Sequence, residues 1–187
     1  MIESQLNGRM LVSDLRDREI FNTQLLYFTC SSLSEDGERV YMISDKTGSP
    51  NVIVRDLVTG EETYLTDNHK GILKSYVYFD GTPGEASVCL DYKREVVYYI
   101  QDNMIYKTER SGNRKILAQV PENRVTAFTH ISGDGKRLCV PMTDGRCLEF
   151  DPVTEGTGLD RRPAYDIDGR VQQEHLSSYL CVYDTEN

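Results

Sequence analysis

Apolar residues along this chain occur in short runs of four or five positions, as expected for strands whose side chains point to alternate faces of a sheet. The runs 40–43 (Val-Tyr-Met-Ile) and 96–100 (Val-Val-Tyr-Tyr-Ile) are examples, and polar turn residues precede both. Successive side chains of a β-strand point to opposite faces, and runs of this length are typical of strands, because helices usually need ten or more residues. The pattern therefore predicts strands that are joined by turns.

A unit of one turn and one strand recurs along the chain. Residues 34–40 read Ser-Glu-Asp-Gly-Glu-Arg-Val and residues 132–138 read Ser-Gly-Asp-Gly-Lys-Arg-Leu. Between them, residues 90–96 (Leu-Asp-Tyr-Lys-Arg-Glu-Val) keep the apolar strand but lack the Asp-Gly turn. The copies start 56 and 42 residues apart, which brackets the ~40–50 residues of one four-stranded propeller blade. The repeat predicts an all-β fold, namely a partial β-propeller.

We predict about three four-stranded antiparallel blades in one domain, 1–187, with the last blade incomplete. The blades span approximately 27–66, 86–120 and 124–187. Their strands are expected near 26–30, 38–44, 51–56 and 61–66, near 86–90, 96–101, 104–109 and 114–120, and near 124–131, 136–142 and 179–184. Asp102-Asn103 and Ser111-Gly112-Asn113 have the residue types of hairpin turns.

The third blade departs from this pattern in three ways. Pro141 has no N–H to donate, so we expect a bulge or an early strand end there. A segment rich in Gly, Asp and Arg, approximately 143–177, then interrupts the blade; connections of this length are usually functional or disordered. An outer strand is also missing before Asn187, which would leave an open sheet edge. We interpret the sequence as the N-terminal fragment of a longer protein.

Composition and charge narrow the range of partners and compartments. The net charge is −9 with no basic tract, which makes nucleic acid and anionic membranes unsuitable partners, since both require a positive surface. The five cysteines are odd in number and form no Cys-x-x-Cys pair, which favours buried free thiols over a metal or redox site. The N-terminus has no basic segment followed by an apolar one, so we expect a cytoplasmic protein.

Four segments together resemble a known family. They are Tyr27-Phe28-Thr29-Cys30 running into Ser34-Glu35-Asp36-Gly37, Ile43-Ser44-Asp45-Lys46-Thr47-Gly48, Asp56-Leu57-Val58-Thr59-Gly60-Glu61-Glu62, and Thr126-Ala127-Phe128-Thr129-His130. With the Arg-rich insertion, they resemble the oligogalacturonate lyases, seven-bladed propeller enzymes of pectin breakdown. The likeness extends over most of the chain from about residue 21. The turns themselves are less specific, because TolB-like propellers and prolyl peptidase propellers use similar ones.

The resemblance implies a β-elimination on oligogalacturonides. A base removes the proton at C5 of a galacturonate, the neighbouring carboxylate is neutralised, and the 4-linked sugar leaves. The family is similar in using a histidine base and a divalent cation, typically manganese, held by histidine and glutamine. This sequence has only His69, His130 and His175, none at short spacing from another. We therefore expect the catalytic and metal residues downstream of Asn187, no metal bound by this fragment, and no activity of the fragment alone.

Candidate substrate contacts are basic residues on loops that would approach the central channel. Arg124 and His130 lie at the entry to an inner strand, and Lys46 lies on a loop between middle strands. Arg161, Arg162 and Arg170 lie in the insertion. A guanidinium can hold a uronate carboxylate through two parallel hydrogen bonds. The simpler interpretation of each residue is an ordinary surface charge.

A second hypothesis, from a different class, is a non-catalytic TolB-like propeller module that binds other proteins through its loops. Such a role predicts export to the periplasm, which the N-terminus does not support. Under either hypothesis, a truncated propeller has open sheet edges through which two chains could associate.

Overall fold

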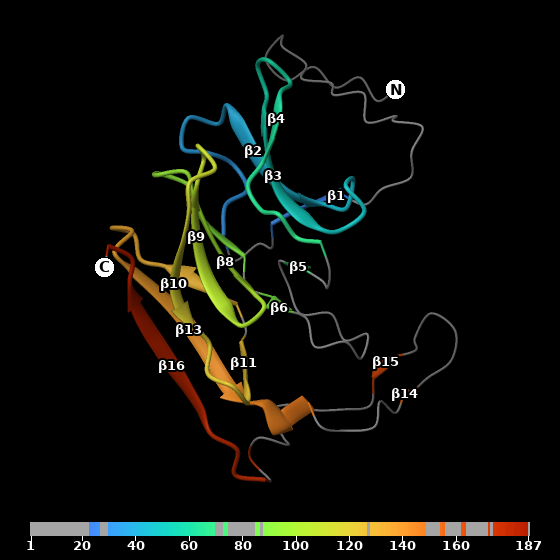
Figure 1. The fold of residues 1–187 in the computed structure, drawn as a ribbon, viewed down its shortest axis with the longest axis vertical. Helices are drawn as coiled ribbons and strands as arrows, with labels where there is room; N and C mark the ends of the chain where they lie inside the picture. The colour runs from blue at the N-terminus through green and yellow to red at the C-terminus, as the bar shows by residue number, and fades with distance from the viewer. Residues whose placement is uncertain are drawn as a thin grey trace.

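In a computed structural model of the chain, three antiparallel sheets lie side by side in chain order (Figure 1). The structure describes residues 23–26, 30–69, 73–74, 85–86, 88–126, 128–148, 154–155, 162–163, 172 and 174–186. Almost all regular structure within these segments is β. The prediction of an all-β, partial propeller-like fold is confirmed. No helix in this part of the chain is long and apolar enough to cross a membrane.

The first sheet has four antiparallel strands in the order of the sequence. They are β1 (Thr23–Leu25), β2 (Arg39–Ser44), β3 (Asn51–Asp56) and β4 (Glu62–Tyr64). An isolated bridge from Leu33 to Val40 extends the inner edge beyond β1. The turn before β2 contains Gly37 with φ of 71°, a left-handed conformation that glycine adopts without steric cost.

The second sheet repeats this arrangement. Its strands are β7 (Cys89–Asp91), β8 (Val96–Gln101), β9 (Met104–Glu109) and β10 (Arg114–Gln119). Asp102 and Asn103 link β8 to β9 with φ of 50° and 60°, as a two-residue type I′ hairpin requires. The turn chemistry in the sequence thus predicted this hairpin correctly.

The third sheet is built around one long strand. Its members are β11 (Arg124–Thr126), β12 (His130–Ile131), β13 (Arg137–Asp144) and β16 (Ser178–Asp184). Both β11 and β12 pair with one side of β13, while β16 pairs with the other side. A short 3-10 helix, η1 (Gly145–Leu148), follows β13.

Two small sheets complete the described part. β5 (Leu73–Lys74) pairs in parallel with β6 (Glu85–Ala86), and β14 (Thr154–Glu155) pairs with β15 (Arg162–Pro163). The predicted insertion, 143–177, contains the end of β13, η1 and the β14–β15 pair. Most of its other residues lie outside the described segments, as does Tyr27-Phe28-Thr29.

The expectation of a bulge or strand end at Pro141 is wrong. β13 continues through this residue, which stands opposite Leu180 in an unbroken register with β16. On the other side of β13, β12 pairs as far as Cys139 and β11 begins at Met142. Val140 and Pro141 therefore lie opposite the interruption between β11 and β12. The break in pairing lies between β12 and β11, so β13 itself continues without a bulge through the residue that has no N–H.

The alignment of the second repeat also needs a correction of one residue. The last pairs before the turns are Ser34 with Arg39, Asp91 with Val96, and Ser132 with Arg137. Asp91 thus corresponds to Ser34, whereas the sequence comparison had placed Leu90 there. Because successive residues of a strand face opposite ways, this shift decides which side chains face each neighbouring sheet.

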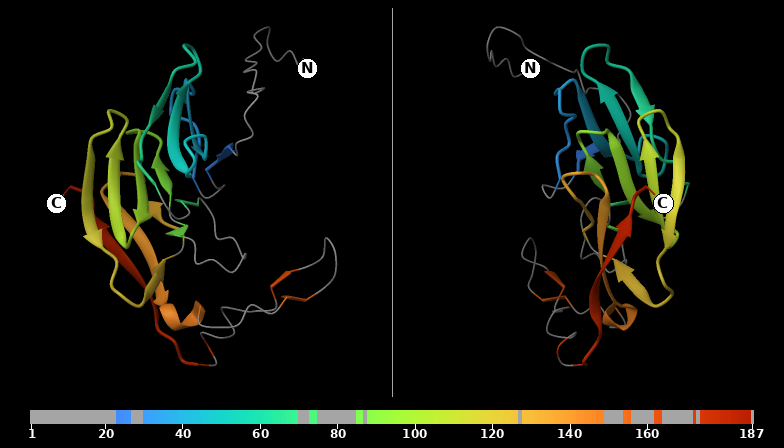
Figure 2. Two further views of the ribbon diagram at one scale, coloured as in Figure 1. Left: turned by 45° about the vertical axis from the view of Figure 1, so that its right-hand side comes forward. Right: turned by 90° about the vertical axis from the view of Figure 1, so that its left-hand side faces the viewer.

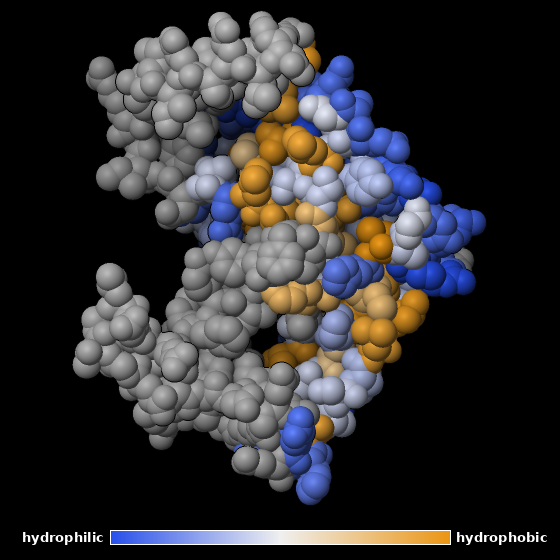
Figure 3. Space-filling model, turned by 180° about the vertical axis from the view of Figure 1, so that it is seen from behind, coloured by the Kyte–Doolittle hydropathy of each residue, from blue (hydrophilic) through white to orange (hydrophobic). Residues whose placement is uncertain are grey.

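The three sheets follow one another in chain order (Figure 2), and two hydrophobic cores hold them together. The first joins Tyr41 and Val54 of the first sheet to Val97 and Tyr99 of the second. The second core joins the opposite face of the second sheet, including Tyr98, Ile100 and Ile105, to Leu138, Val140 and Met142 of the third. Sheets packed face to face in sequence order are the arrangement of propeller blades. Seen from behind, hydrophobic surface remains over the third sheet (Figure 3).

Candidate functional site

A pocket of about 250 Å³ lies where the inner strands of the three sheets end. Its walls are residues 30–31 of the first sheet, 89–93 of the second and 130–133 of the third. The last two segments each run from an inner strand, β7 or β12, into the turn that follows it. Three distant parts of the sequence thus meet at one place, on the inner side of the sheets.

The pocket carries two side chains of the types that bind anions, Lys93 and His130. Lys93 places its ammonium 5.8 Å from the centroid of the Tyr92 ring, and within the described segments it forms no ion pair. The imidazole of His130 is exposed and makes no hydrogen bond to any described side chain or backbone group. Ser31 and Ser132 also line the pocket, but their hydroxyls donate to the Leu33 carbonyl oxygen at 2.9 Å and to Asp134 at 2.5 Å. Lys93 and His130 suit a small polar ligand that carries a negative charge.

The one carboxylate in the pocket wall is already neutralised. Asp91, whose side chain is 5% exposed, accepts hydrogen bonds from the backbone N–H of Lys93 and Arg94 at 3.2 Å each. It also pairs with the Arg94 guanidinium at 2.9 Å. Asp91 therefore fixes the turn that carries Lys93 and leaves the Lys93 charge available to a ligand.

The thiols of the pocket are not activated. Burial raises the pKa of Cys30, and burial raises the pKa of Cys89 to about 12, although the neighbouring Thr129 side chain acts to lower it. Both side chains are therefore protonated at neutral pH, and only a thiolate is an effective nucleophile or metal ligand. The four described cysteines are free, as the sequence predicted, although only Cys89 is fully buried.

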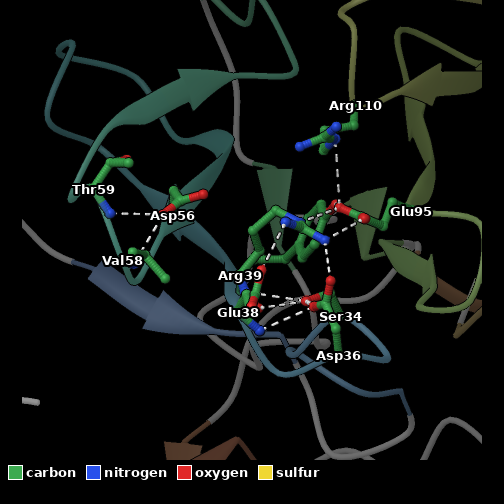
Figure 4. Close-up of polar contacts among 10 residues, drawn as sticks. Ser34, Asp36, Glu38, Arg39, Asp56, Val58, Thr59, Glu95 and Arg110 are labelled. Carbon is green, nitrogen blue, oxygen red and sulfur yellow. Dashed lines mark hydrogen bonds and ion pairs between the residues drawn. The ribbon is translucent and has the colours of Figure 1, made fainter.

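An ion cluster joins the first two sheets near the same turns (Figure 4). Arg39 donates from Nε to Oε2 of Glu95 at 2.7 Å and from Nη2 to Oε1 at 2.8 Å. The Tyr41 hydroxyl donates to Oε2 at 2.7 Å, and Arg110 lies 3.7 Å from the same oxygen. Asp36 contacts Arg39 from the other side at 2.5 Å. A bidentate Arg–carboxylate pair fixes the two partners in orientation as well as in distance.

This cluster is built around a charged carboxylate. Burial by itself would raise the pKa of Glu95, but hydrogen bonds from Arg39 and Tyr41 outweigh it and hold the pKa below its ordinary value of 4.5. The hydrogen bond to Glu95 raises the pKa of Arg39. Burial, together with the bond to Glu95, raises the pKa of Tyr41. The cluster is therefore a fixed ion pair between sheets and has no group that would exchange a proton near neutral pH.

The substrate contacts predicted from the sequence lie at separate places. Arg124 begins β11, donates to the carbonyl oxygen and Oγ of Ser177 at 2.9 and 2.8 Å, and lies 4.6 Å over the Tyr179 ring. Lys46, on the loop after β2, lies 3.6 Å from the Glu62 carboxylate. Arg162 begins β15. The side chain of Arg162, and both Arg161 and Arg170, lie outside the described residues.

Among the candidates whose side chains the structure describes, His130 alone lines the pocket. Arg124 pairs with Asp144 and His130 with Cys139, so at ~3.3 Å per residue they stand roughly 17 Å apart along β13. Lys46 follows the end of β2 that corresponds to the Arg124 end of β13. The structure thus places Lys46 and Arg124 at one end of their sheets and His130, with the pocket, at the other.

The sequence interpretation missed Lys93. Its turn, 91–96, had lost the Asp-Gly pair of the other copies and was treated as a worn repeat. In the corrected alignment, Lys93 and Arg94 replace Asp36 and Gly37. A change from turn residues to two cations was a signal of a specialised turn. What the sequence could not provide is the proximity of this turn to His130.

No set of side chains in the described segments is arranged as a metal centre. No group of three or more His, Cys, Asp and Glu residues there could hold an ion. His69 is exposed and pairs with Asp67 at 2.9 Å, and His175 lies in a left-handed turn with φ of 52°.

Comparison with solved structures relates the fold to two lyases. The chain is similar to an oligogalacturonate lyase in complex with manganese, at a TM-score of 0.54, 17% identity and coverage of 68% of this chain and 31% of that one. It is also similar to an oligogalacturonate lyase from Vibrio parahaemolyticus, at a TM-score of 0.59, 15% identity and coverage of 89% and 39%. A putative TolB from Agrobacterium tumefaciens matches at a TM-score of 0.43, 16% identity and coverage of 81% and 56%.

The similarities to the two lyases establish the fold, and the chain spans well under half the length of each lyase. No protein-family model matches the sequence, and no characterised protein matches it at the sequence level.

Proposed function

We propose that this chain is the N-terminal part of an oligogalacturonate lyase-like propeller, and that the whole protein cleaves pectin-derived oligogalacturonides by β-elimination in the cytoplasm. The observation that carries the proposal is the match of its successive sheets to two oligogalacturonate lyases at TM-scores of 0.54 and 0.59. One propeller fold supports many activities. The substrate class therefore rests on this match together with the chemistry of the pocket.

In this proposal the chain supplies scaffold and part of the substrate rim. The reaction needs a base for the C5 proton and a positive group that neutralises the neighbouring carboxylate. One of the matching lyases is in complex with manganese, but the residues described here do not fit a metal site. We therefore derive no step through a metal, and we place the catalytic centre of the complete propeller in blades outside 1–187.

The pocket offers the most direct role for this chain's own residues. Lys93 and His130 would hold a uronate carboxylate, whereas the hydroxyls of Ser31 and Ser132 already donate to the Leu33 carbonyl oxygen and to Asp134 within their own turns. Because Asp91 is paired with Arg94, it would not repel this carboxylate strongly. Arg124 and Lys46 are further proposed contacts, and both lie at the end of the sheets that is opposite to the pocket. The proposed contacts in the insertion are Arg161, Arg162 and Arg170.

Binding and turnover of trigalacturonate by the purified chain, measured with and without manganese, test this proposal. We expect binding without formation of unsaturated product. Lys93→Ala and His130→Ala should each weaken binding about tenfold, the equivalent of ~1.4 kcal/mol, because each removes a charged or polar contact. Lys115→Ala is the matched control, since Lys115 is an exposed cation on the outer strand of the same sheet.

The opposing outcomes are distinct. Clear turnover by this chain would contradict a catalytic centre in other blades. Equal affinity for trigalacturonate and its methyl ester would contradict recognition through the carboxylate. Absence of any binding would contradict a role of this chain in the substrate rim, and partner binding by a non-catalytic propeller would become the better hypothesis.

A further inference from the structure

The turn that carries Lys93 is held in place by one carboxylate of its own sheet. Oδ1 of Asp91 accepts hydrogen bonds from the backbone N–H of Lys93 and from that of Arg94, both at 3.2 Å. Oδ2 of Asp91 accepts a third bond from Nη1 of Arg94 at 2.9 Å. The position of Lys93 in the pocket wall therefore depends on where the Asp91 carboxylate lies.

The third sheet contacts this ion pair directly, through the turn between β12 and β13. A Cβ at Gly135 would lie 2.5 Å from Nη1 of Arg94 and 2.6 Å from Oδ2 of Asp91. Both distances are too short for a non-bonded contact of a Cβ atom, so a larger residue fits here only if the pair moves. The equivalent glycine of the first sheet, Gly37, has open space at this position. The close packing is therefore a feature of the Gly135 turn and not of Asp-Gly turns in general.

The Gly135 turn is itself fixed from within and from the second sheet. Ser132 Oγ donates to Asp134 at 2.5 Å, and the Gly135 N–H donates to the Ser132 carbonyl oxygen at 2.8 Å. The carbonyl oxygen of Gly135 accepts a hydrogen bond at 2.6 Å from Oγ1 of Thr185, a buried residue. The carbonyl oxygen of Thr185 in turn accepts from Nζ of Lys107, on β9, at 3.2 Å. Thr185 thus ties the turn of the third sheet to the second sheet.

The same hairpin, β12–β13, also carries a side chain of the pocket. β12 begins with His130, pairs with β13 opposite Cys139 and runs directly into the turn that contains Gly135. His130 and Lys93 both line the pocket. The hairpin therefore supplies one of these two side chains and packs against the support of the other.

We propose that the β12–β13 hairpin fixes the spacing between Lys93 and His130 for the carboxylate of a ligand. Gly135 is then a positioning residue, which acts on Lys93 through the ion pair beneath it, and Thr185 is a second one, which holds Gly135 in place. Two groups that are already at the right separation bind a compact anion more tightly, because less freedom of motion is lost on binding. The choice of a uronate as the ligand rests on the proposed function, whereas the positioning of Lys93 does not.

Amide hydrogen exchange of the purified chain, resolved by NMR, tests the positioning without any ligand. We expect Gly135→Ala to speed exchange at the Lys93 and Arg94 amides at least about tenfold, because a displaced Asp91 no longer protects them. Gly37→Ala is the matched control, since Gly37 has the same φ of 71° but open space around a Cβ. It should leave exchange at these two amides unchanged.

Calorimetric titration with trigalacturonate then measures the consequence for the ligand. Gly135→Ala should weaken binding about fivefold, the effect of one misplaced polar contact, whereas Gly37→Ala should not weaken it. Thr185→Val removes the hydroxyl that holds Gly135 and should also weaken binding, while Thr185→Ser keeps the hydroxyl and should restore it. The preference for trigalacturonate over its methyl ester should fall together with the affinity, because a misplaced Lys93 no longer contacts the carboxylate.

The opposing results separate this proposal from the proposed function. Unchanged exchange at the Lys93 and Arg94 amides in Gly135→Ala would overturn the positioning, and so would an equal increase in all three sheets, which marks general destabilisation. A Thr185→Ser variant that binds as weakly as Thr185→Val would overturn the role of the Thr185 hydroxyl. Faster exchange at the two amides, in a chain whose wild type does not bind trigalacturonate, would support the positioning of Lys93 and contradict a uronate as its ligand.

Discussion

Arg39 and Arg137 stand on nearly identical turns, yet one is part of a core contact and the other is a surface charge. The backbone of both turns is fixed by the same Ser and Asp hydrogen bonds. Between the residues that the structure describes, Arg39 alone receives a carboxylate from a neighbouring sheet. Local sequence thus determines the shape of each turn, whereas the adjoining sheet determines how much the turn contributes to stability. Variants at equivalent positions can separate these two contributions.

The largest expected difference is between equivalent apolar positions. Ile105 is fully buried between the second and third sheets, whereas Leu180 occupies the same position in the third sheet and is 60% exposed. We expect Ile105→Ala to lower the free energy of unfolding by about 2–5 kcal/mol. Leu180→Ala should lower it by no more than about 0.5 kcal/mol.

Urea denaturation of the purified variants measures both values. Similar losses in the two variants would mean that other residues of the chain cover the outer face of the third sheet. That result would remove the contrast between the two regions.

The arginines themselves should show a smaller difference. Arg39→Ala leaves the Glu95 carboxylate, 19% exposed, without its bidentate partner. Removing one member of a buried pair costs about 3–5 kcal/mol, and partial exposure here reduces our expectation to about 2–3 kcal/mol. Arg137→Ala breaks an exposed pair and should cost under about 1 kcal/mol. Equal costs by urea denaturation would contradict the assignment of Arg39 as the link between sheets.

The pH dependence of stability sharpens the same contrast. Glu95 has a folded-state pKa below 4.5, so it binds a proton more readily in the unfolded state. Its contribution is present above pH 4.5 and is lost as the pH falls below that value, through the folded-state pKa. Glu95→Gln should therefore lose most stability relative to wild type near pH 7 and least near pH 3. A difference that stays constant over this range would contradict a charged Glu95.

The sequence predicted those features that depend on neighbours along the chain. The hairpin at Asp102-Asn103 and the Asp-Gly turn at Gly37 follow from residues that tolerate positive φ. Strand alternation predicted β8 and β9. The prediction at Pro141 was wrong, because the strand beside it was interrupted instead. Local pattern carries no information on a gap in the partner strand.

The candidate site was harder to predict, because it depends on contacts between sheets. His130 was selected from the sequence, but Lys93 was overlooked and Arg124 proved to lie at the other end of β13. The one-residue shift at Asp91 arose because the second turn has lost its glycine, so that the apolar strand alone guided the alignment. Pairing partners were needed to correct it.

Gly37 and Gly135 offer the finest comparison, since both have φ of 71°. A Cβ at Gly37 would meet nothing within 4 Å, whereas one at Gly135 would lie 2.5 Å from Nη1 of Arg94 and 2.6 Å from Oδ2 of Asp91. Gly37→Ala should cost about 1–2 kcal/mol from the left-handed backbone alone. Gly135→Ala should cost about 1 kcal/mol more, because the Asp91–Arg94 pair must also move.

Thermal unfolding measures this difference, and Arg94→Ala in the Gly135→Ala background shows its source. Removing the Arg94 side chain relieves part of the clash, so the second substitution should then be less harmful than Arg94→Ala is in the wild type. Purely additive effects would mean that the third sheet does not press on the turn of the second. In that case the Asp91 turn, and Lys93 with it, would be positioned by the second sheet alone.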